Sequence, residues 1–155
     1  MTLFDNHNHS QFSFDGKRTS VEASAKSAAA QGLGGLAVTD HCDFFIPPVK
    51  KMQGNVVPEW FDVAKQQEEI TRVQAIVPVK ILKGIEIGMH EDCREEIRKV
   101  LADNRFDQVI ASVHYLDDVD PYHGEYYDGK DWKEAYGRYL ETIFREMIWL
   151  GDFDI

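Results

Sequence analysis

Short apolar runs alternate along the chain with longer segments in which apolar residues recur at helical spacing. The short runs predict strands of a parallel sheet, and the amphipathic segments predict helices on its faces. The predicted strands are residues 3–9, 35–39, 79–87 and 106–114. The predicted helices are residues 20–31, 58–76, 91–102 and a last helix that follows Asp131 and ends near Gly151. Strand and helix thus alternate four times, which predicts an α/β protein with right-handed crossovers.

Several helix boundaries have local signals. Thr19, followed three positions later by Glu22, is typical of a capping box and predicts the start of the first helix. Pro58 suits the first turn of the second helix. Asp131 is a good cap for the last helix. The proline- and glycine-containing segment 43–57 predicts an irregular loop.

The end of the chain resembles the beginning of a further strand. Residues 151–155 are mostly apolar or acidic and follow the last predicted helix directly. A parallel sheet that stopped here would leave apolar surface and unpaired backbone groups at its edge. We therefore expect a continuing C-terminal half, or self-association, to cover this edge.

The composition and charge of the chain narrow the class of protein, its compartment and its partners. With 155 residues, 43% of them hydrophobic and 28% charged, the chain suits one globular domain. No apolar run approaches the roughly 18 residues of a membrane span, and no secretory signal precedes the first strand. We therefore expect a cytoplasmic protein without membrane contact. The net charge of −10 makes binding to nucleic acid unexpected, because that needs clustered lysine and arginine.

The predicted strands end in residues that bind metal ions. His7 and His9 end the first strand, Asp40 and His41 follow the second, Glu86 lies near the end of the third, and His114 ends the fourth. The carboxyl ends of parallel strands meet on one face of a (β/α) fold, so these side chains should converge there. Three or more imidazoles with a carboxylate predict a divalent-metal site for zinc, manganese or iron.

Each candidate ligand also has a plainer structural explanation. His7 and His9 point the same way on a strand, although a pair of exposed histidines would look identical in sequence. Asp15 fits a metal ligand and an Asp-Gly turn equally well. Glu86 lies between two isoleucines, where a carboxylate needs a cation or an ion pair. His114 alone would more often be a core residue.

Adjacent strand residues cannot both face the site. We therefore assign His41 to the metal and Asp40 to supporting a ligand. Cys42 offers a thiolate as an alternative ligand, but packing of a small buried side chain is the favoured explanation. Lys17 and Arg18, in the loop after the first strand, are candidates for contact with a phosphate, although solvated loop charges are more common.

Two other histidines do not fit the pattern. His90 begins a helix and His123 lies in a loop, so both are expected at the surface. The sequence has no glycine-rich phosphate loop, nucleophile elbow or paired-cysteine zinc motif.

Four segments together resemble a known family. HNHSQFSFDG, TDHCDF, KGIEIG and ASVHYLDD are similar, in order and spacing, to the first four motifs of the PHP (polymerase and histidinol phosphatase) superfamily, most of all its histidinol-phosphate phosphatase branch. The resemblance implies a distorted (β/α)₇ TIM-like barrel with two or three divalent ions. Residues 1–155 would be the N-terminal part of a single PHP domain, with its first four to five βα units. The positions that match family ligands are His7, His9, Asp15, His41, Glu86 and His114, with Glu86 as a bridge.

The resemblance also shows what this sequence lacks. The family pattern continues past the fourth motif, with a Gly-His motif after the fifth strand and an Asp-x-His motif near the end, and these 155 residues do not reach those two motifs. The chain should therefore carry about two thirds of a metal site.

From these features we expect a metal-dependent phosphatase that acts on a small phosphorylated substrate. The favoured reaction is hydrolysis of L-histidinol phosphate in histidine biosynthesis, by water that the ions activate. Asp40 and Glu86 are the expected catalytic residues, with Lys17 and Arg18 as substrate contacts. Two alternatives stay open: a PHP phosphoesterase for nucleotides or nucleic-acid ends, and a catalytically silent metal-binding fragment or interaction module.

Overall fold

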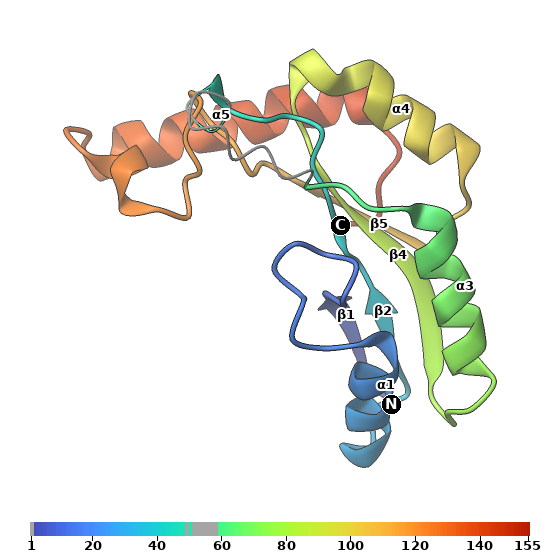
Figure 1. The fold of residues 1–155 in the computed structure, drawn as a ribbon. Helices are drawn as coiled ribbons and strands as arrows, with labels where there is room; N and C mark the ends of the chain where they lie inside the picture. The colour runs from blue at the N-terminus through green and yellow to red at the C-terminus, as the bar shows by residue number, and fades with distance from the viewer. Residues whose placement is uncertain (1, 49, 51–58) are drawn as a thin grey trace.

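The computed structural model describes residues 2–48, 50 and 59–155. Parallel strands form a curved half-barrel that helices cover on one face (Figure 1). The strands are β1 (Phe4–Asn8), β2 (Gly35–Val38), β3 (His41–Cys42), β4 (Lys80–Gly88) and β5 (Gln108–Ser112). The helices are α1 (Val21–Ala30), α3 (Val63–Gln74), α4 (Arg94–Asp103) and α5 (Trp132–Leu150), with short 3₁₀ turns η1 (Glu91–Cys93) and η2 (Gly124–Tyr127). The predicted α/β class, with its alternation of strand and helix, is confirmed.

The long strand β4 organises the sheet. β2 pairs with its residues 80–83, β3 pairs with its residues 86–87 in the same register, and β5 pairs with residues 84–88 on its other side. β1 pairs with β2, and every pairing is parallel. Because β2 and β3 share one register, they act as a single strand that is interrupted at Thr39 and Asp40. The sequence predicted one strand here and did not predict the interruption.

Alternation along β4 separates the core from the site. Ile81, Ile85 and Ile87 are buried and belong to the apolar clusters of the sheet and its helices. The first cluster joins α1 and α3 to β2, and the second joins β3 and β4 to the start of α3 and to α4. Since successive side chains on a strand face opposite ways, Glu86 is directed away from the two isoleucines beside it. Its carboxylate is thereby held on the face that the helices do not cover.

Two predicted helix starts were wrong. α1 is capped by Ser20, whose Oγ accepts a hydrogen bond from the backbone N–H of Ala23, one residue later than the predicted cap Thr19. α3 starts at Val63, where Asp62 is the cap, because Glu59 is instead bridged to Asp43 in extended backbone. The predicted start at residue 58 and much of the predicted loop 43–57 lie outside the described residues.

The last helix and the chain end follow the prediction more closely. Asp131 caps α5 by accepting hydrogen bonds from two backbone N–H groups, and Gly151, with φ of 72°, ends it. The terminal residues then lie along β5: Ile155 N–H donates to Val109 O, and Ala111 N–H donates to Ile155 O. These bonds flank one β5 residue in the manner of a parallel ladder. No helix in the described part of the chain meets the length and apolar character of a membrane span.

Candidate metal centre

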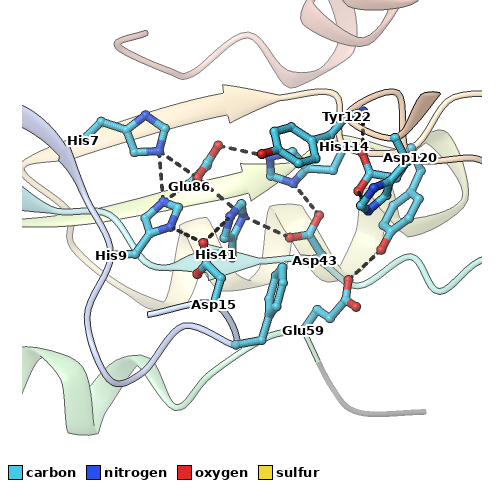
Figure 2. A pocket seen from close by; sticks show the side chains of 13 residues that line it. His7, His9, Asp15, His41, Asp43, Glu59, Glu86, His114, Asp120 and Tyr122 are labelled. Atoms are coloured by element: carbon cyan, nitrogen blue, oxygen red, sulfur yellow. Dashed lines mark hydrogen bonds and ion pairs between the residues drawn. The ribbon is translucent and has the colours of Figure 1, made fainter. Parts of the chain in front are cut away.

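The strand ends bring histidine and carboxylate side chains to one point. Figure 2 shows His7, His9, His41 and Glu86 directed toward one another at one end of a cavity of about 580 Å³. β1 supplies His7, β3 supplies His41 and β4 supplies Glu86, while His9 and His114 follow β1 and β5. The convergence that the sequence predicted is therefore present in the structure.

Glu86 lies at the centre of the cluster, and its side chain is only 4% exposed. Its Oε2 lies 3.0 Å from His7 Nε2, 2.9 Å from His9 Nε2 and 3.4 Å from His41 Nδ1. Its Oε1 lies 3.0 Å from His114 Nε2. The two oxygens of one carboxylate thus face different sets of imidazoles, as a carboxylate between two ions would.

Asp15 closes a second side of the cluster. Its Oδ2 lies 2.9 Å from His9 Nδ1 and 3.6 Å from His41 Nε2. The loop turns back because Gly16 packs against the backbone of Ser10, where a Cβ would lie 2.0 Å from a carbonyl oxygen. The Asp-Gly pair is therefore a turn, and that turn carries the carboxylate to the histidines; ligation by Asp15 stays a prediction.

Three sets of side chains present ligand atoms that lie within 4.8 Å of one another: His7, His9 and Glu86; His9, Asp15 and His41; and His41, Glu86 and His114. Around a tetrahedral ion with bonds of about 2.0–2.2 Å, ligand atoms lie roughly 3.3–3.6 Å apart, close to the spacings here. In addition, His41 Nδ1 is buried without a hydrogen bond and lies 3.4 Å from Glu86 Oε2. The donor set and this unsatisfied nitrogen fit divalent cations.

The electrostatics of the cluster agree with this fit. Burial alone would lower the pKa of His9, but hydrogen bonds to Glu86 and Asp15 outweigh it and raise the pKa to about 9. Burial likewise opposes protonation of His114, and bonds to Asp43 and Glu86 raise its pKa to about 10. Burial would raise the pKa of Glu86, yet His114 and His9 hold it well below its usual range. The cluster is thus a site of strong negative potential in which positive charge is favoured.

Asp43 belongs to the site, although the sequence analysis missed it. Its side chain is 3% exposed, and its Oδ1 lies 2.7 Å from His114 Nδ1. Gly88 makes room for this contact, because a Cβ there would lie 1.7 Å from Asp43 Oδ1. A signal was present: Asp43 lies two residues after His41, so both side chains point to the same face of β3.

Several predicted residues lie elsewhere. Asp40 is fully buried, and its carboxylate accepts hydrogen bonds from Ser10 N–H, Ser10 Oγ and Gln66 Nε2. It supports the loop after His9 and does not line the cavity, so its catalytic role stays a prediction without a direct contact. Lys17 and Arg18 are exposed and do not line the cavity, so the geometry gives no support for a phosphate contact.

Cys42 is 1% exposed and packs in the apolar cluster of β3 and β4. Burial raises the pKa of its thiol to about 12, which favours packing over a thiolate ligand. His90 caps η1 and stacks on Phe45, away from the cavity.

The wall of the cavity opposite the metal cluster, here called the far wall, is formed by loops, and the sequence did not predict it. It contains Glu59, Tyr115, Asp120, Tyr122 and His123. Tyr115 donates a hydrogen bond of 2.7 Å to Glu59 Oε2, and Lys50 Nζ lies 2.6 Å from Glu59 Oε1, so both contacts fix this carboxylate against the wall. The His123 side chain is 68% exposed, as expected for a surface residue, but it also lines the cavity.

Comparison with known proteins places this geometry in context. The chain is 35% identical over 143 residues to a histidinol-phosphatase of Lactococcus lactis subsp. lactis, covering 90% of this chain and 50% of that protein. It is 30% identical over 141 residues to a probable histidinol-phosphatase of Clostridium acetobutylicum, covering 91% of this chain and 51% of that protein.

A solved structure agrees with these matches. The crystal structure of histidinol phosphate phosphatase from Lactococcus lactis, complexed with zinc, L-histidinol and phosphate, aligns with a TM-score of 0.81 and 29% identity. The alignment covers 97% of this chain and 55% of that one. The chain therefore spans about half the length of the relatives it matches.

The family assignment rests on a match over almost the whole chain. The family model described as PHP domain covers residues 5–154, which is nearly the whole chain and includes every residue of the metal cluster. The chain belongs to the PHP domain family.

Proposed function

We propose that this chain provides the metal-holding part of a PHP-family phosphomonoester hydrolase whose substrate is L-histidinol phosphate. The observation that carries the proposal is Glu86, a buried carboxylate that faces four imidazoles from the ends of three strands, β1, β3 and β5. A carboxylate is retained at such a position when cations neutralise it. The relatives named histidinol-phosphatase, and the solved relative with zinc, L-histidinol and phosphate, support this reaction.

The three sets of ligand atoms favour two or three divalent ions, with Glu86 between two of them. Zinc, manganese and iron all accept mixed imidazole and carboxylate ligands. When bound, such ions offset the charge of a phosphate and lower the pKa of water, which allows hydrolysis at neutral pH.

The residues around the ligands hold them in place. Ser112 Oγ donates a hydrogen bond of 2.8 Å to Glu86 Oε1, and Ser13 Oγ donates to Asp15. Asp43 fixes the ring of His114 so that its Nε2 faces Glu86. Contacts of this kind fix the orientation of ligands and sharpen affinity for an ion.

The far wall favours a substrate with a positive group. Asp120 lies there, and so does Glu59, which is already paired with Lys50, whose Nζ is 2.6 Å from Glu59 Oε1. The described residues that line the cavity include no lysine or arginine. A phosphate would therefore depend on the ions, while an ammonium or imidazolium at the other end would meet the Asp120 carboxylate. L-histidinol phosphate has both ends, whereas adenosine monophosphate carries no cationic group at neutral pH.

The test is phosphate release by the purified chain after loading with zinc or manganese. L-histidinol phosphate, adenosine monophosphate and p-nitrophenyl phosphate would be compared, with chelated protein and Glu86→Gln as controls. We expect release from L-histidinol phosphate that both controls abolish. Faster release from the nucleotide, with none from L-histidinol phosphate, would refute the substrate assignment.

A second candidate is a metal-binding chain without turnover. The observation that favours it is coverage: these 155 residues align with about half the length of each relative. Metal analysis beside the same assay separates the two. Stable metal without phosphate release would support the second candidate, and absence of both would contradict the metal centre itself.

A further inference from the structure

A second cavity lies beside helix α5. Its walls are α5, the turn at residues 115–118 and residues 89–91, which follow β4. Its volume is about 170 Å³, whereas sites for drug-sized ligands have roughly 300–1,000 Å³. Among the described residues, Tyr115 is the only one that lines both this cavity and the one at the metal cluster. This α5 cavity is therefore a separate place for a small ligand.

The α5 cavity is lined by a buried hydroxyl group without a partner. Thr142 is 4% exposed, and its Oγ1 makes no hydrogen bond. A threonine within a helix often bonds the carbonyl four residues earlier, as Thr71 on α3 does with Gln67 O at 2.7 Å. Thr142 makes no such bond to Arg138. Because a buried hydroxyl without a partner lowers stability, a ligand that bonds Thr142 would offset this cost.

A buried carboxylate lies one helical turn further along the same face of α5. The Glu146 side chain is 3% exposed; its Oε2 accepts a hydrogen bond of 2.6 Å from Trp149 Nε1, and its Oε1 lies 3.2 Å from Arg145. Arg145 is 47% exposed, so water screens much of its charge. A carboxylate accepts about four hydrogen bonds, and within the described residues Glu146 accepts them from these two side chains only. This part of the cavity therefore favours a positively charged donor, such as an ammonium group.

Two arginines of α5 also line this cavity. Arg138 and Arg145 have side chains that are 40% and 47% exposed, so they lie nearer to solvent than the buried carboxylate. Arg138 donates a hydrogen bond of 2.7 Å to Asp117 Oδ1, and this bond holds the turn against the helix. A guanidinium has five N–H donors, and each of the two arginines uses only some of them in its contacts. Both therefore keep donors for an anionic group.

The mixture of charges narrows the class of ligand. In the described part of the chain, no set of three metal-binding side chains converges at this cavity, and the two arginines oppose a bare cation. A phosphate ion would meet the carboxylates of Glu146 and Glu91. A small molecule with adjacent positive and negative groups matches both kinds of side chain.

We propose that the α5 cavity binds a free α-amino acid. Its ammonium group donates to the Glu146 carboxylate and to the Thr142 hydroxyl, and its carboxylate accepts from Arg138 or Arg145. This pairing leaves no charge of the ligand without a partner, as a buried site requires. The proposal goes beyond the hydrolysis of a phosphate, and it holds whether or not the chain has that activity.

The indole of Trp149 reports on this site, because its Nε1 donates to Glu146. The chain has three tryptophans, and the other two, Trp60 and Trp132, are 50% and 68% exposed. NMR of the isotope-labelled chain resolves the indole N–H signals, which Trp60→Phe and Trp132→Phe assign. The probe is L-alanine, and methylamine and acetate carry one of its charged groups each. We expect L-alanine to shift the Trp149 signal saturably, with a Kd about tenfold lower than that of either single-charge probe, because both of its groups bind at once.

Substitution of Thr142 makes the test specific. Thr142→Val removes the hydroxyl, and we expect it to weaken L-alanine binding about tenfold, the effect of losing a hydrogen bond to a charged group. The same variant should raise the melting temperature of the free chain by about 2–4 °C, because it removes an unsatisfied hydroxyl. Thr142→Ser keeps the hydroxyl and should bind like the parent. Thr71→Val, at an exposed position of α3, is the matched control and should also bind like the parent.

Other results would overturn the proposal. Absence of a saturable Trp149 shift with L-alanine, or equal shifts of all three indoles, would show that the cavity holds no amino acid. An equal Kd for methylamine would identify a site for a simple cation, and an equal Kd for acetate a site for an anion. If Thr142→Val bound L-alanine like the parent, the ligand would not lie at Thr142. A melting temperature of this variant below that of the parent would show that the hydroxyl is already bonded, which would remove the basis of the proposal.

Discussion

Replacing Asp43 by asparagine removes one buried charge from the site while almost preserving the side-chain shape. Asp43 Oδ1 lies 2.7 Å from His114 Nδ1, and the carboxylate is 3% exposed. The bond is charge-assisted and holds the ring with Nε2 facing Glu86 Oε1 at 3.0 Å. Asparagine can still accept a hydrogen bond from Nδ1, so the ring should stay near its place but with less electron density on Nε2.

The expected cost follows from this geometry. Loss of a carboxylate that orients a histidine ligand weakens metal binding by roughly 10–100-fold, which corresponds to about 1.4–2.8 kcal/mol. In the metal-free protein, the pKa of His114 should fall from about 10 toward the ordinary histidine value, because Asp43 is the largest of the contacts that raise it. Exposed Asp118, changed to asparagine, is the matched control and should alter neither quantity.

Two measurements check this prediction. Competition with a chromophoric chelator gives the zinc affinity of each variant, and NMR titration of the histidine ring protons gives the pKa in chelated protein. Affinity within threefold of the parent, with an unchanged His114 titration, would refute the role assigned to Asp43.

The remaining predictions concern the same cluster. Glu86→Ala should release more metal than His114→Ala, because the carboxylate faces two sets of ligands; equal losses by elemental analysis would argue against a bridge. Gly88→Ala should displace Asp43, whose Oδ1 would lie 1.7 Å from the new Cβ, and should lower both the melting temperature and zinc affinity. In metal-free protein, the raised pKa values of His9 (about 9) and His114 (about 10) stabilise the fold fully below the unfolded value of 6.5, and this contribution is lost as the pH rises through the folded values. Urea unfolding with chelator should therefore give a lower free energy at pH 10 than at pH 6.5 from this linkage; a free energy that rises over this range would contradict the assigned contacts. Zinc should instead bind more tightly as the pH rises toward 9, since it competes with these protons.

Periodicity predicted the strands and the face on which the ligands meet. Glu86 between two isoleucines was enough to place a carboxylate opposite the core, because side chains alternate on a strand. The register that aligns His41 with Glu86 depends on the pairing of β3 with β4, which local sequence does not encode.

The other residues of the site depend on tertiary structure. Asp43 was overlooked because it was assigned to a loop, whereas it continues from β3 and bridges to Glu59. The far wall, with Glu59 and Asp120, brings together loops that are distant in the chain, and no local pattern predicts their meeting. Thr19 and Ser20 are both good caps in sequence, and in the structure Ser20 takes the cap position with extended backbone.

Strand residues form the metal-cluster end of the cavity, and loop residues form the opposite end. Substitutions at the two ends should therefore have different effects. The cation-binding end is fixed to paired backbone, where a shift of one residue would reverse every side chain. The opposite end is formed by loop residues that lie outside the strands of the sheet. Under the proposed function, substitutions in these loops would change which organic group is accepted and would leave the metal ligands in place.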